Sequence, residues 1–253
     1  IAERAVRLFG AKLAHFDGGN LRNAIPREAY IVLGVPSDKA TAFESDVKVY
    51  GEALCAEFAI VEKGAKIELS KAEAPATILA EQTQHNLLLA LIGVPSGVLA
   101  MSAAMPGLVE TSSNLASLKR TGDSVITVTT SQRSSIESAR DNVSDAVRAA
   151  FELGGAQVTT KGKYPGWKPN MKSAILKVAC ETYKELFGTE AKIKAIHAGL
   201  ECGLFLEKAP HLDMMSFGPT MRGVHSPDER LDIASTERWW RHLLLLLEKA
   251  PVK

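Results

Sequence analysis

The chain has 253 residues, which is enough for one large domain or two smaller ones. Hydrophobic residues make up 46% and charged residues 23%, as in an ordinary globular protein, and the net charge of +1 gives no electrostatic reason to expect a nucleic acid or a membrane as partner. No run of about 18 apolar residues predicts a membrane span. The cysteines, Cys55, Cys180 and Cys202, are odd in number and widely spaced, which favours the reducing cytoplasm over a disulfide framework.

The chain begins inside a helical pattern. In IAERAVRLFGAKLAHF, residues 1–16, Ala5, Leu8, Phe9 and Leu13 recur at helical spacing, and no capping residue precedes them. We therefore expect a chain that starts within a longer protein.

Helices and strands then alternate irregularly as far as residue 161. In chain order we expect a turn at 17–20, a strand over 29–35, a helix over 37–58, a strand over 65–72, a helix over 75–92, a hairpin of 112–118 and 124–130 around 121–123, a helix from the capping box Ser134–Glu137 to Gly154–Gly155, and a strand over 156–161. Such a mixture predicts an α+β sandwich with helices on one face of an antiparallel sheet.

The composition changes at GKYPGWKPN, residues 162–170, whose prolines, glycines and aromatic residues predict a rigid connector between two domains. Beyond it we expect a helix over 172–187, a strand over 192–197, a short helix over 200–205, a strand over 213–217 and a helix over 236–249. Alternation of helix and strand predicts a parallel α/β arrangement.

Two of these expected strands end in loops that could carry a site, because ligands of parallel sheets bind beyond the carboxyl ends of strands. One loop contains Glu201 and the other His225. The residues 226–229, SPDE, read as a capping box that opens a helix and fixes the backbone after His225, so its imidazole is a candidate metal ligand. A surface histidine and a glutamate in the first turn of a helix are the plainer alternatives. A hydrolytic zinc site needs at least three protein ligands, so this part of the chain supplies an incomplete site.

Four stretches together resemble the aminoacyl-histidine (Xaa-His) dipeptidases, which belong to the di-zinc peptidase family that includes carnosinases and several amino-acid deacylases. These stretches are LRNAIPREA (21–29), KGKYPGWKPN (161–170), IHAGLECGLF (196–205) and SFGPTMRGVHSPDER (216–230), in family order along essentially the whole chain. The resemblance implies a catalytic α/β domain that binds two metal ions, with an inserted α+β lid domain that forms the homodimer. Residues 1–161 then correspond to the lid and dimerisation domain, an antiparallel sheet with helices. Residues 162–253 correspond to the C-terminal part of a parallel α/β zinc-peptidase catalytic domain.

The resemblance also implies roles for individual residues. His225 matches the last metal ligand of the family, and Glu201 matches an acidic residue that meets the amino end of the substrate near the metals. Asn23 matches a lid asparagine that hydrogen-bonds the substrate or the tetrahedral intermediate. Arg133, which follows a strand, matches the lid arginine that pairs with the substrate carboxylate. Gly218 and Thr220 belong to the loop before His225 and are expected to offer backbone contacts to the substrate.

The remaining metal ligands and the general-base glutamate of the family lie in an N-terminal half of the catalytic domain that the sequence lacks. We therefore expect this chain alone to bind no metal pair and to hydrolyse no dipeptide, with two divalent metal ions, zinc by the resemblance, present only in the complete enzyme. The expected partners are a dipeptide, a second copy joined through the lid, and the missing half. Two alternatives are a non-catalytic lid module that only dimerises and an N-acyl amino acid deacylase of the same superfamily.

Overall fold

The computed structural model has a mixed α/β fold. It describes residues 1–103, 105–122, 124–163, 167, 170, 172–194, 201–224 and 228–250, with the side chain of Glu201 outside this set. Two compact units are present. The first comprises Ile1–Leu99, Ser112–Gln132 and Arg140–Thr160, and the second comprises Ala100–Thr111, Arg133–Ala139 and Lys161–Lys253. Each unit therefore combines segments that are distant in the sequence.

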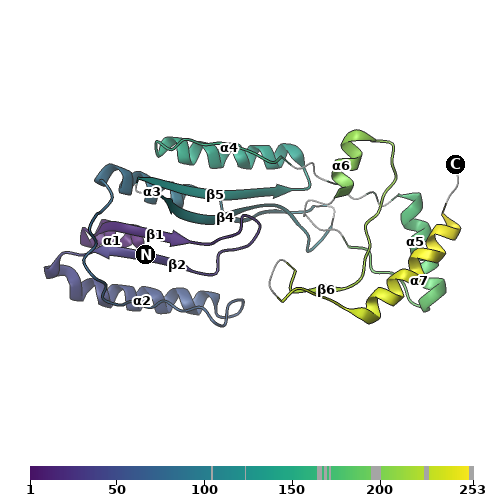
Figure 1. Cartoon of the computed structure of the whole chain (residues 1–253), viewed down its shortest axis with the longest axis horizontal. Coiled ribbons are helices and arrows are strands. Elements are labelled where there is room, and N and C mark those ends of the chain that lie inside the picture. The colour runs from purple at the N-terminus through teal and green to yellow at the C-terminus, as the bar shows by residue number, and fades with distance from the viewer. Residues whose placement is uncertain are drawn as a thin grey trace. The chain divides into compact units, whose positions relative to one another are not determined.

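A five-stranded sheet forms the framework of the first unit (Figure 1). Its strands are β1 (Lys12–Gly18), β2 (Ala29–Gly34), β3 (Gly97–Met101), β4 (Val109–Thr121) and β5 (Val125–Ser134), in the order β2-β1-β4-β3 with β5 paired to β4. β1 and β2 run antiparallel from the pair Lys12 and Gly34 to the pair Gly18 and Ala29, and Gly18 also pairs with Leu118 of β4. The β1–β2 connection therefore starts beside β4.

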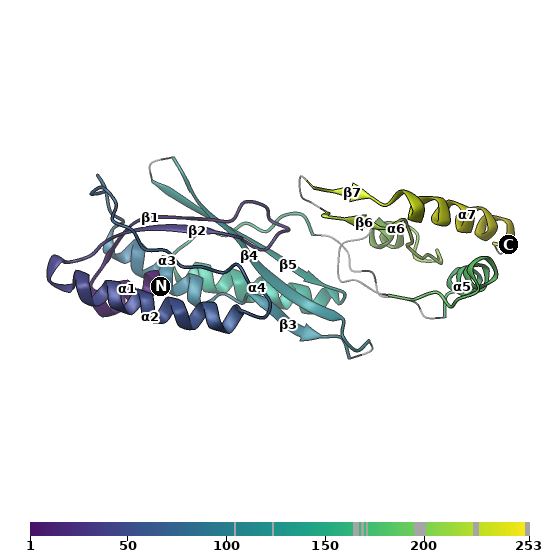
Figure 2. The ribbon, with the colours of Figure 1, turned by 90° about the horizontal axis from the view of Figure 1, so that it is seen from below.

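Four helices gather on one face of this sheet (Figure 2). They are α1 (Ala2–Phe9), α2 (Ala40–Phe58, led by the short 3-10 turn Ser37–Lys39), α3 (Glu81–Gly93) and α4 (Glu137–Leu153). Phe43 and Val47 of α2 are buried against α1, and Val147 and Phe151 of α4 are buried against α3. Full burial of side chains of this size stabilises by about 1.5–3 kcal/mol each, so these contacts account for the helix layer. The expected layer of helices on a sheet is present.

The expectation of one helix over residues 1–16 is wrong beyond Phe9. Gly10 adopts a left-handed φ of 67°, and the N–H groups of Gly10 and Ala11 bond back to the last turn of α1 and close it. The chain then enters β1, where Leu13 is fully buried. Leu13 fits a helical spacing by coincidence, since α1 and β1 bury residues in adjoining parts of the core.

Two expected strands, 65–72 and 156–161, are also wrong, because neither forms a strand. Ile67 instead packs on the first unit's longest helix, where a Cβ added at Gly51 would lie 3.4 Å from the Ile67 side chain. The alternating apolar residues of the segment 65–72 therefore reflect packing along a helix and not pairing with a neighbouring strand.

The remaining expectations for the first unit hold in outline. The hairpin appears as β4 and β5, while α3 starts at Glu81 and leaves residues 75–80 outside any helix. The Ser134 hydroxyl accepts a hydrogen bond from the Ile136 N–H at 3.0 Å, one residue earlier than a capping box requires. Ser134 is thus the last residue of β5 and fixes the turn into α4.

The second unit contains α5 (Ala174–Phe187), α6 (Glu201–Lys208), α7 (Ile233–Lys249) and a ribbon of β6 (Met221–Arg222) with β7 (Arg230–Leu231). Its helix ends are capped by side chains: the Ser173 hydroxyl accepts from the Leu176 N–H at 3.1 Å, and the Asp232 carboxylate accepts from the Ser235 N–H at 2.7 Å. α5 and α7 lie side by side (Figure 1). Across the described residues, none of the helices is both long enough and apolar enough to cross a membrane.

The expected parallel arrangement is not seen among the described residues of the second unit. Its one recorded ribbon, β6 with β7, is antiparallel, and residues 192–194 and 213–217 form no strand. Residues 195–197 lie outside the described residues. The expected helix start at 226–229 is wrong, because Arg230 and Leu231 belong to β7 and α7 begins only at Ile233. Ser226 and Pro227 themselves lie outside the described residues.

Candidate functional site

The turn that carries Asn23 connects β1 to β2 and is tied to β4. The Ala24 N–H donates to the Leu21 carbonyl at 3.2 Å, which places Asn23 third in a four-residue turn. The side-chain amide of Asn114, in β4, donates to the Ala24 carbonyl at 2.7 Å and reaches the Arg22 carbonyl at 3.5 Å. The Asn23 side chain is exposed and has no hydrogen-bond partner in the described part of the chain. Its amide is therefore free to meet a ligand.

Gly19 brings the start of the same turn against β4. Its φ of 63° is left-handed, and a Cβ at this position would overlap the Ala116 carbonyl oxygen and lie 3.2 Å from Cγ of Pro26. The Gly19 N–H donates to the Glu28 carbonyl at 3.2 Å on the far side of the turn. Only glycine fits here, since any side chain would push the turn off the strand.

Arg133 lies one residue before the end of β5 and is half-buried. Its neighbour Ser134 has its Oγ 2.9 Å from Oγ1 of Thr111 in β4. Because side chains alternate along a strand, Arg133 projects from the opposite face. Its guanidinium makes no hydrogen bond or ion pair with any residue that the structure describes, which leaves its fork of donors available for a carboxylate.

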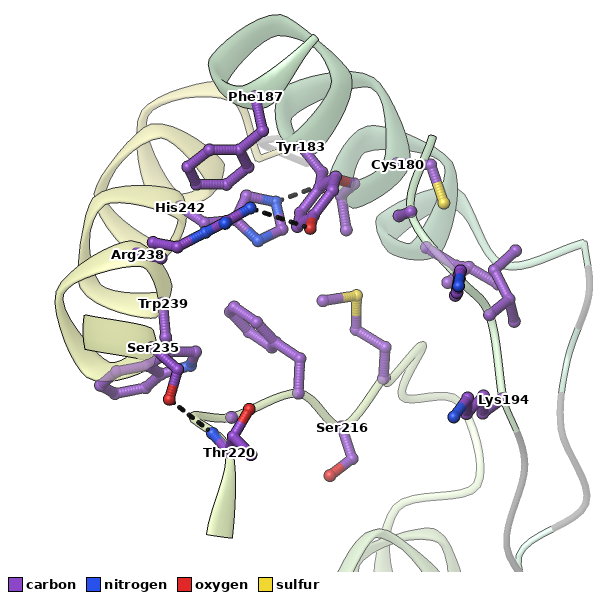
Figure 3. Close-up of a pocket in the computed structure, with 18 of the residues that line it drawn as sticks. Cys180, Tyr183, Phe187, Lys194, Ser216, Thr220, Ser235, Arg238, Trp239 and His242 are labelled. Carbon is purple, nitrogen blue, oxygen red and sulfur yellow. Dashed lines mark hydrogen bonds between the residues drawn. The ribbon is translucent and has the colours of Figure 1, made fainter. Parts of the chain in front are cut away.

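A cavity of about 1040 Å³ occupies the second unit between α5, α7 and the segments 189–194 and 214–220 (Figure 3). Its walls are largely apolar and aromatic, with Tyr183, Phe217 and Trp239 among the lining residues. Sites for drug-sized ligands have volumes of about 300–1,000 Å³, so this space is larger than a dipeptide alone requires.

Two of the expected substrate-binding residues, Gly218 and Thr220, line this cavity. A Cβ added at Gly218 would meet nothing within 4 Å. Thr220 is held through its backbone: its N–H donates to Oγ of Ser235 at 2.8 Å, as Figure 3 shows, and its carbonyl accepts from the Asp232 N–H at 2.9 Å. The start of α7 thus uses both backbone groups of Thr220 and leaves the side-chain hydroxyl for a ligand.

One cavity wall contains a buried indole N–H. Nε1 of Trp239 is buried and has no hydrogen-bond acceptor among the described residues. An unsatisfied buried donor costs about 1–3 kcal/mol. This wall would therefore be stabilised by a group that brings an acceptor.

His242 ties α7 to α5 at the back of the cavity. Its Nε2 lies 3.0 Å from the Ala179 carbonyl and 3.0 Å from Oγ1 of Thr182, and since a carbonyl only accepts, Nε2 carries the proton. The rings of Tyr183 and Phe217 surround the imidazole at centroid distances of 5.4 and 5.3 Å. His242 is 7% exposed. Its role is to hold the two helices together.

A second tie joins the segment 213–217 to the start of α5. The Ser173 hydroxyl, with the backbone N–H groups of Ile175 and Ala174, hydrogen-bonds the Asp213 carboxylate and holds its pKa below its usual range. Asp213 therefore stays ionised and satisfies N–H groups that the first turn of α5 leaves open.

The expected metal ligand lies outside the described residues: nothing is described at His225, nor for the side chain of Glu201, the first residue of α6. Among the residues that are described, no three His, Cys, Asp or Glu side chains come together in a way that could hold a metal ion. The donor set of this part of the chain does not fit a two-metal centre, which needs several ligands for each ion.

The chain has the architecture of a two-part α/β protein. One unit is an antiparallel sheet layered with helices, and in the other two helices flank a large apolar cavity. The chain belongs to the peptidase family M20/M25/M40, whose family model matches residues 17–249. The resemblance inferred from the four sequence stretches is thereby confirmed at the level of the family.

Two relatives illustrate this membership. The cytosol non-specific dipeptidase of Escherichia coli (strain K12) is 39% identical over 242 residues, which cover 96% of this chain and 50% of that protein. The crystal structure of an aminoacylhistidine dipeptidase from Vibrio alginolyticus matches with a TM-score of 0.81 and 36% identity, covering 100% of this chain and 52% of that one. The chain thus spans about half the length of the relatives it matches.

Proposed function

We propose that this chain is the lid and the C-terminal part of the catalytic domain of a metal-dependent dipeptidase that hydrolyses Xaa-His dipeptides. The observation that carries the proposal is the match of the whole chain to about half of an aminoacylhistidine dipeptidase, with a TM-score of 0.81. Residues 1–161 are the lid and dimerisation domain in this proposal, and residues 162–253 are part of the catalytic domain.

The substrate-binding roles are those that the resemblance to the family implies, and the chemistry of the side chains suits them. The guanidinium of Arg133 binds the two oxygens of the dipeptide carboxylate at once, a geometry that an arginine fork matches. The exposed amide of Asn23 donates to the peptide carbonyl and to the oxyanion that replaces it during hydrolysis. Glu201 binds the amino end of the dipeptide. Gly218 and the Thr220 hydroxyl complete the wall beside it.

The metal ions of the complete enzyme, two divalent ions with zinc as the proposed metal, need ligands beyond those that the described residues offer. His225 is the one ligand that we assign to this chain. Since the resemblance assigns the other metal ligands and the general-base glutamate to the half of the catalytic domain outside this chain, the chain alone is proposed to be inactive.

The cavity of the second unit supports the proposal that this chain packs against a missing half of the catalytic domain. An apolar cavity of about 1040 Å³, and a buried indole N–H with no acceptor among the described residues, are features that a packed partner would cover. The missing half of the catalytic domain is proposed to pack into this space, with backbone carbonyls that can accept from Trp239. The described parts of two segments that read as strands, 192–194 and 214–217, line the cavity, where added strands could pair with them.

A second copy of the chain is proposed to join through the lid, and the reducing cytoplasm is the proposed location, since the Escherichia coli relative is named a cytosol dipeptidase. The names of both relatives favour a dipeptidase over a deacylase.

Hydrolysis by the assembled enzyme tests the proposal. The half of the catalytic domain that this chain lacks is taken from the Escherichia coli relative and fused in front of it, and a panel of Xaa-His dipeptides, other dipeptides and N-acetyl amino acids is assayed with zinc. We expect hydrolysis of Xaa-His dipeptides and little cleavage of the acylated amino acids. Preferential cleavage of N-acetyl amino acids would favour the deacylase, and a stable dimer without any hydrolysis would favour the non-catalytic lid module.

A further inference from the structure

The amide nitrogen of Asn114 reaches the two carbonyl groups that flank Asn23 in the chain. It donates to the Ala24 carbonyl at 2.7 Å and lies 3.5 Å from the Arg22 carbonyl. The sequence separation is 90 positions from Ala24 and 92 from Arg22, and Asn114 is half-buried in β4. The contact therefore connects the centre of the sheet to the turn and does not arise from chain proximity.

This contact matches the chemistry of asparagine. The side-chain NH₂ carries two donor hydrogens, so one nitrogen can serve two carbonyl oxygens. An aspartate has nearly the same shape but only acceptor oxygens when ionised, and would set a negative charge against both carbonyls. The adjacent residue, Ser113, points the other way and accepts from the amide of Gln132 at 3.2 Å. Asn114 is thus the residue in this part of β4 whose side chain hydrogen-bonds to the turn.

The turn needs such an anchor because the Asn23 side chain has no hydrogen bond of its own to any described residue. Its amide is exposed and has no hydrogen-bond partner in the described part of the chain, so its direction is set by the backbone of residues 22–24 alone. That backbone is fixed by the Leu21–Ala24 turn bond and by Asn114. A misplacement of about 1 Å in a group that contacts the reacting atoms can reduce a rate about a hundredfold.

We propose that Asn114 is a positioning residue that holds the turn of residues 21–24 so that the Asn23 amide meets the substrate. The inference rests on the proposed function, in which Asn23 binds the peptide carbonyl. Asn114 itself touches no substrate and acts through the two carbonyl groups.

The first experiment is a double-mutant cycle in the fused enzyme described above, with Asn23→Ala, Asn114→Asp and the double variant. We expect each single change to lower kcat about a hundredfold with a smaller effect on KM, and the double variant to be no more than about threefold worse than Asn23→Ala, because both changes remove the same interaction. Multiplication of the two single effects in the double variant would overturn the inference. The matched control is Asn86→Asp, since Asn86 also forms a side-chain hydrogen bond, accepting from Gln82 at 2.7 Å on α3, and aspartate can still accept it.

The second experiment uses this chain without its partner and requires no activity. Backbone ¹⁵N relaxation measures the order parameters of residues 22–24 in the wild type, in Asn114→Asp, in Asn114→Ala and in Asn86→Asp. We expect values near 0.85 in the wild type and the control, falling below about 0.6 in both Asn114 variants while the strands stay ordered. An unchanged turn in the Asn114 variants would refute the positioning role even if the fused enzyme proved inactive, and inactivity of the wild-type fusion alone would count against the proposed function instead.

Discussion

Replacing Gly19 with alanine should destabilise the first unit by about 3 kcal/mol. The left-handed backbone costs about 1–2 kcal/mol for a residue with a Cβ. The added methyl group would also overlap the Ala116 carbonyl oxygen, and forced overpacking of this kind costs about 1–3 kcal/mol. A matched control exists at Gly10, which has a similar φ of 67° but no atom within 4 Å of the place that the new methyl group would occupy, so Gly10→Ala should cost only about 1 kcal/mol.

Chemical denaturation followed by two probes measures this difference. The three tryptophans, Trp167, Trp239 and Trp240, all belong to the second unit, so their fluorescence reports its unfolding, while far-UV circular dichroism reports both units. We expect Gly19→Ala to shift the circular dichroism transition and leave the tryptophan transition in place. Equal effects of Gly19→Ala and Gly10→Ala would refute the close approach of the turn to β4, because backbone strain alone would then explain both.

Three further predictions concern caps, charge and the cavity wall. Ser173→Ala should destabilise the second unit by about 1 kcal/mol through loss of the α5 cap, seen as an earlier tryptophan transition, and no shift would argue against the cap. The Arg4 guanidinium, which forms two hydrogen bonds to Asp46, lowers the pKa of that carboxyl, so its contribution is present above the unfolded pKa of about 3.9 and is lost as the pH falls through the lower folded value. Asp46→Asn should therefore flatten the loss of first-unit stability as the pH falls below about 4, and an unchanged pH dependence would contradict this pairing. Trp239→Phe should leave the stability of the chain unchanged or slightly raised, because it removes an N–H that has no acceptor among the described residues. It should nevertheless weaken binding of the missing half in a pull-down, and equal binding would remove Trp239 from the proposed contact.

Local sequence signals predicted those elements whose ends are set by neighbouring residues. The hairpin of β4 and β5 was predicted from its turn at Gly122, and α5 and α7 from their apolar spacing. Leu13 was assigned to the first helix although it belongs to β1. It is buried in the same core as that helix, so its position in the sequence happened to match the helical spacing. The segment 213–217 was misassigned because its composition suits a strand, while strand formation needs a partner that the described residues do not supply.

The candidate site was predicted through the resemblance more than through spacing. Spacing alone singled out the loop of His225, which lies outside the described residues, whereas Asn23 and Arg133 came from the family pattern. The anchoring of the Asn23 turn by Asn114 had no signal in the sequence, because Asn114 and the turn of residues 21–24 come together only through the sheet. Long-range hydrogen bonds of this kind depend on strand register, which local patterns do not encode.

Metal content and dipeptide hydrolysis, measured on this chain before and after fusion to the missing half, test whether the chain holds only part of a dipeptidase active centre. We expect no tightly bound metal pair and no turnover of an Xaa-His dipeptide by the chain alone, and two metal ions per chain with turnover after fusion. Two metal ions and turnover by the chain alone would contradict it, and would mean that residues 1–253 contain a complete catalytic centre.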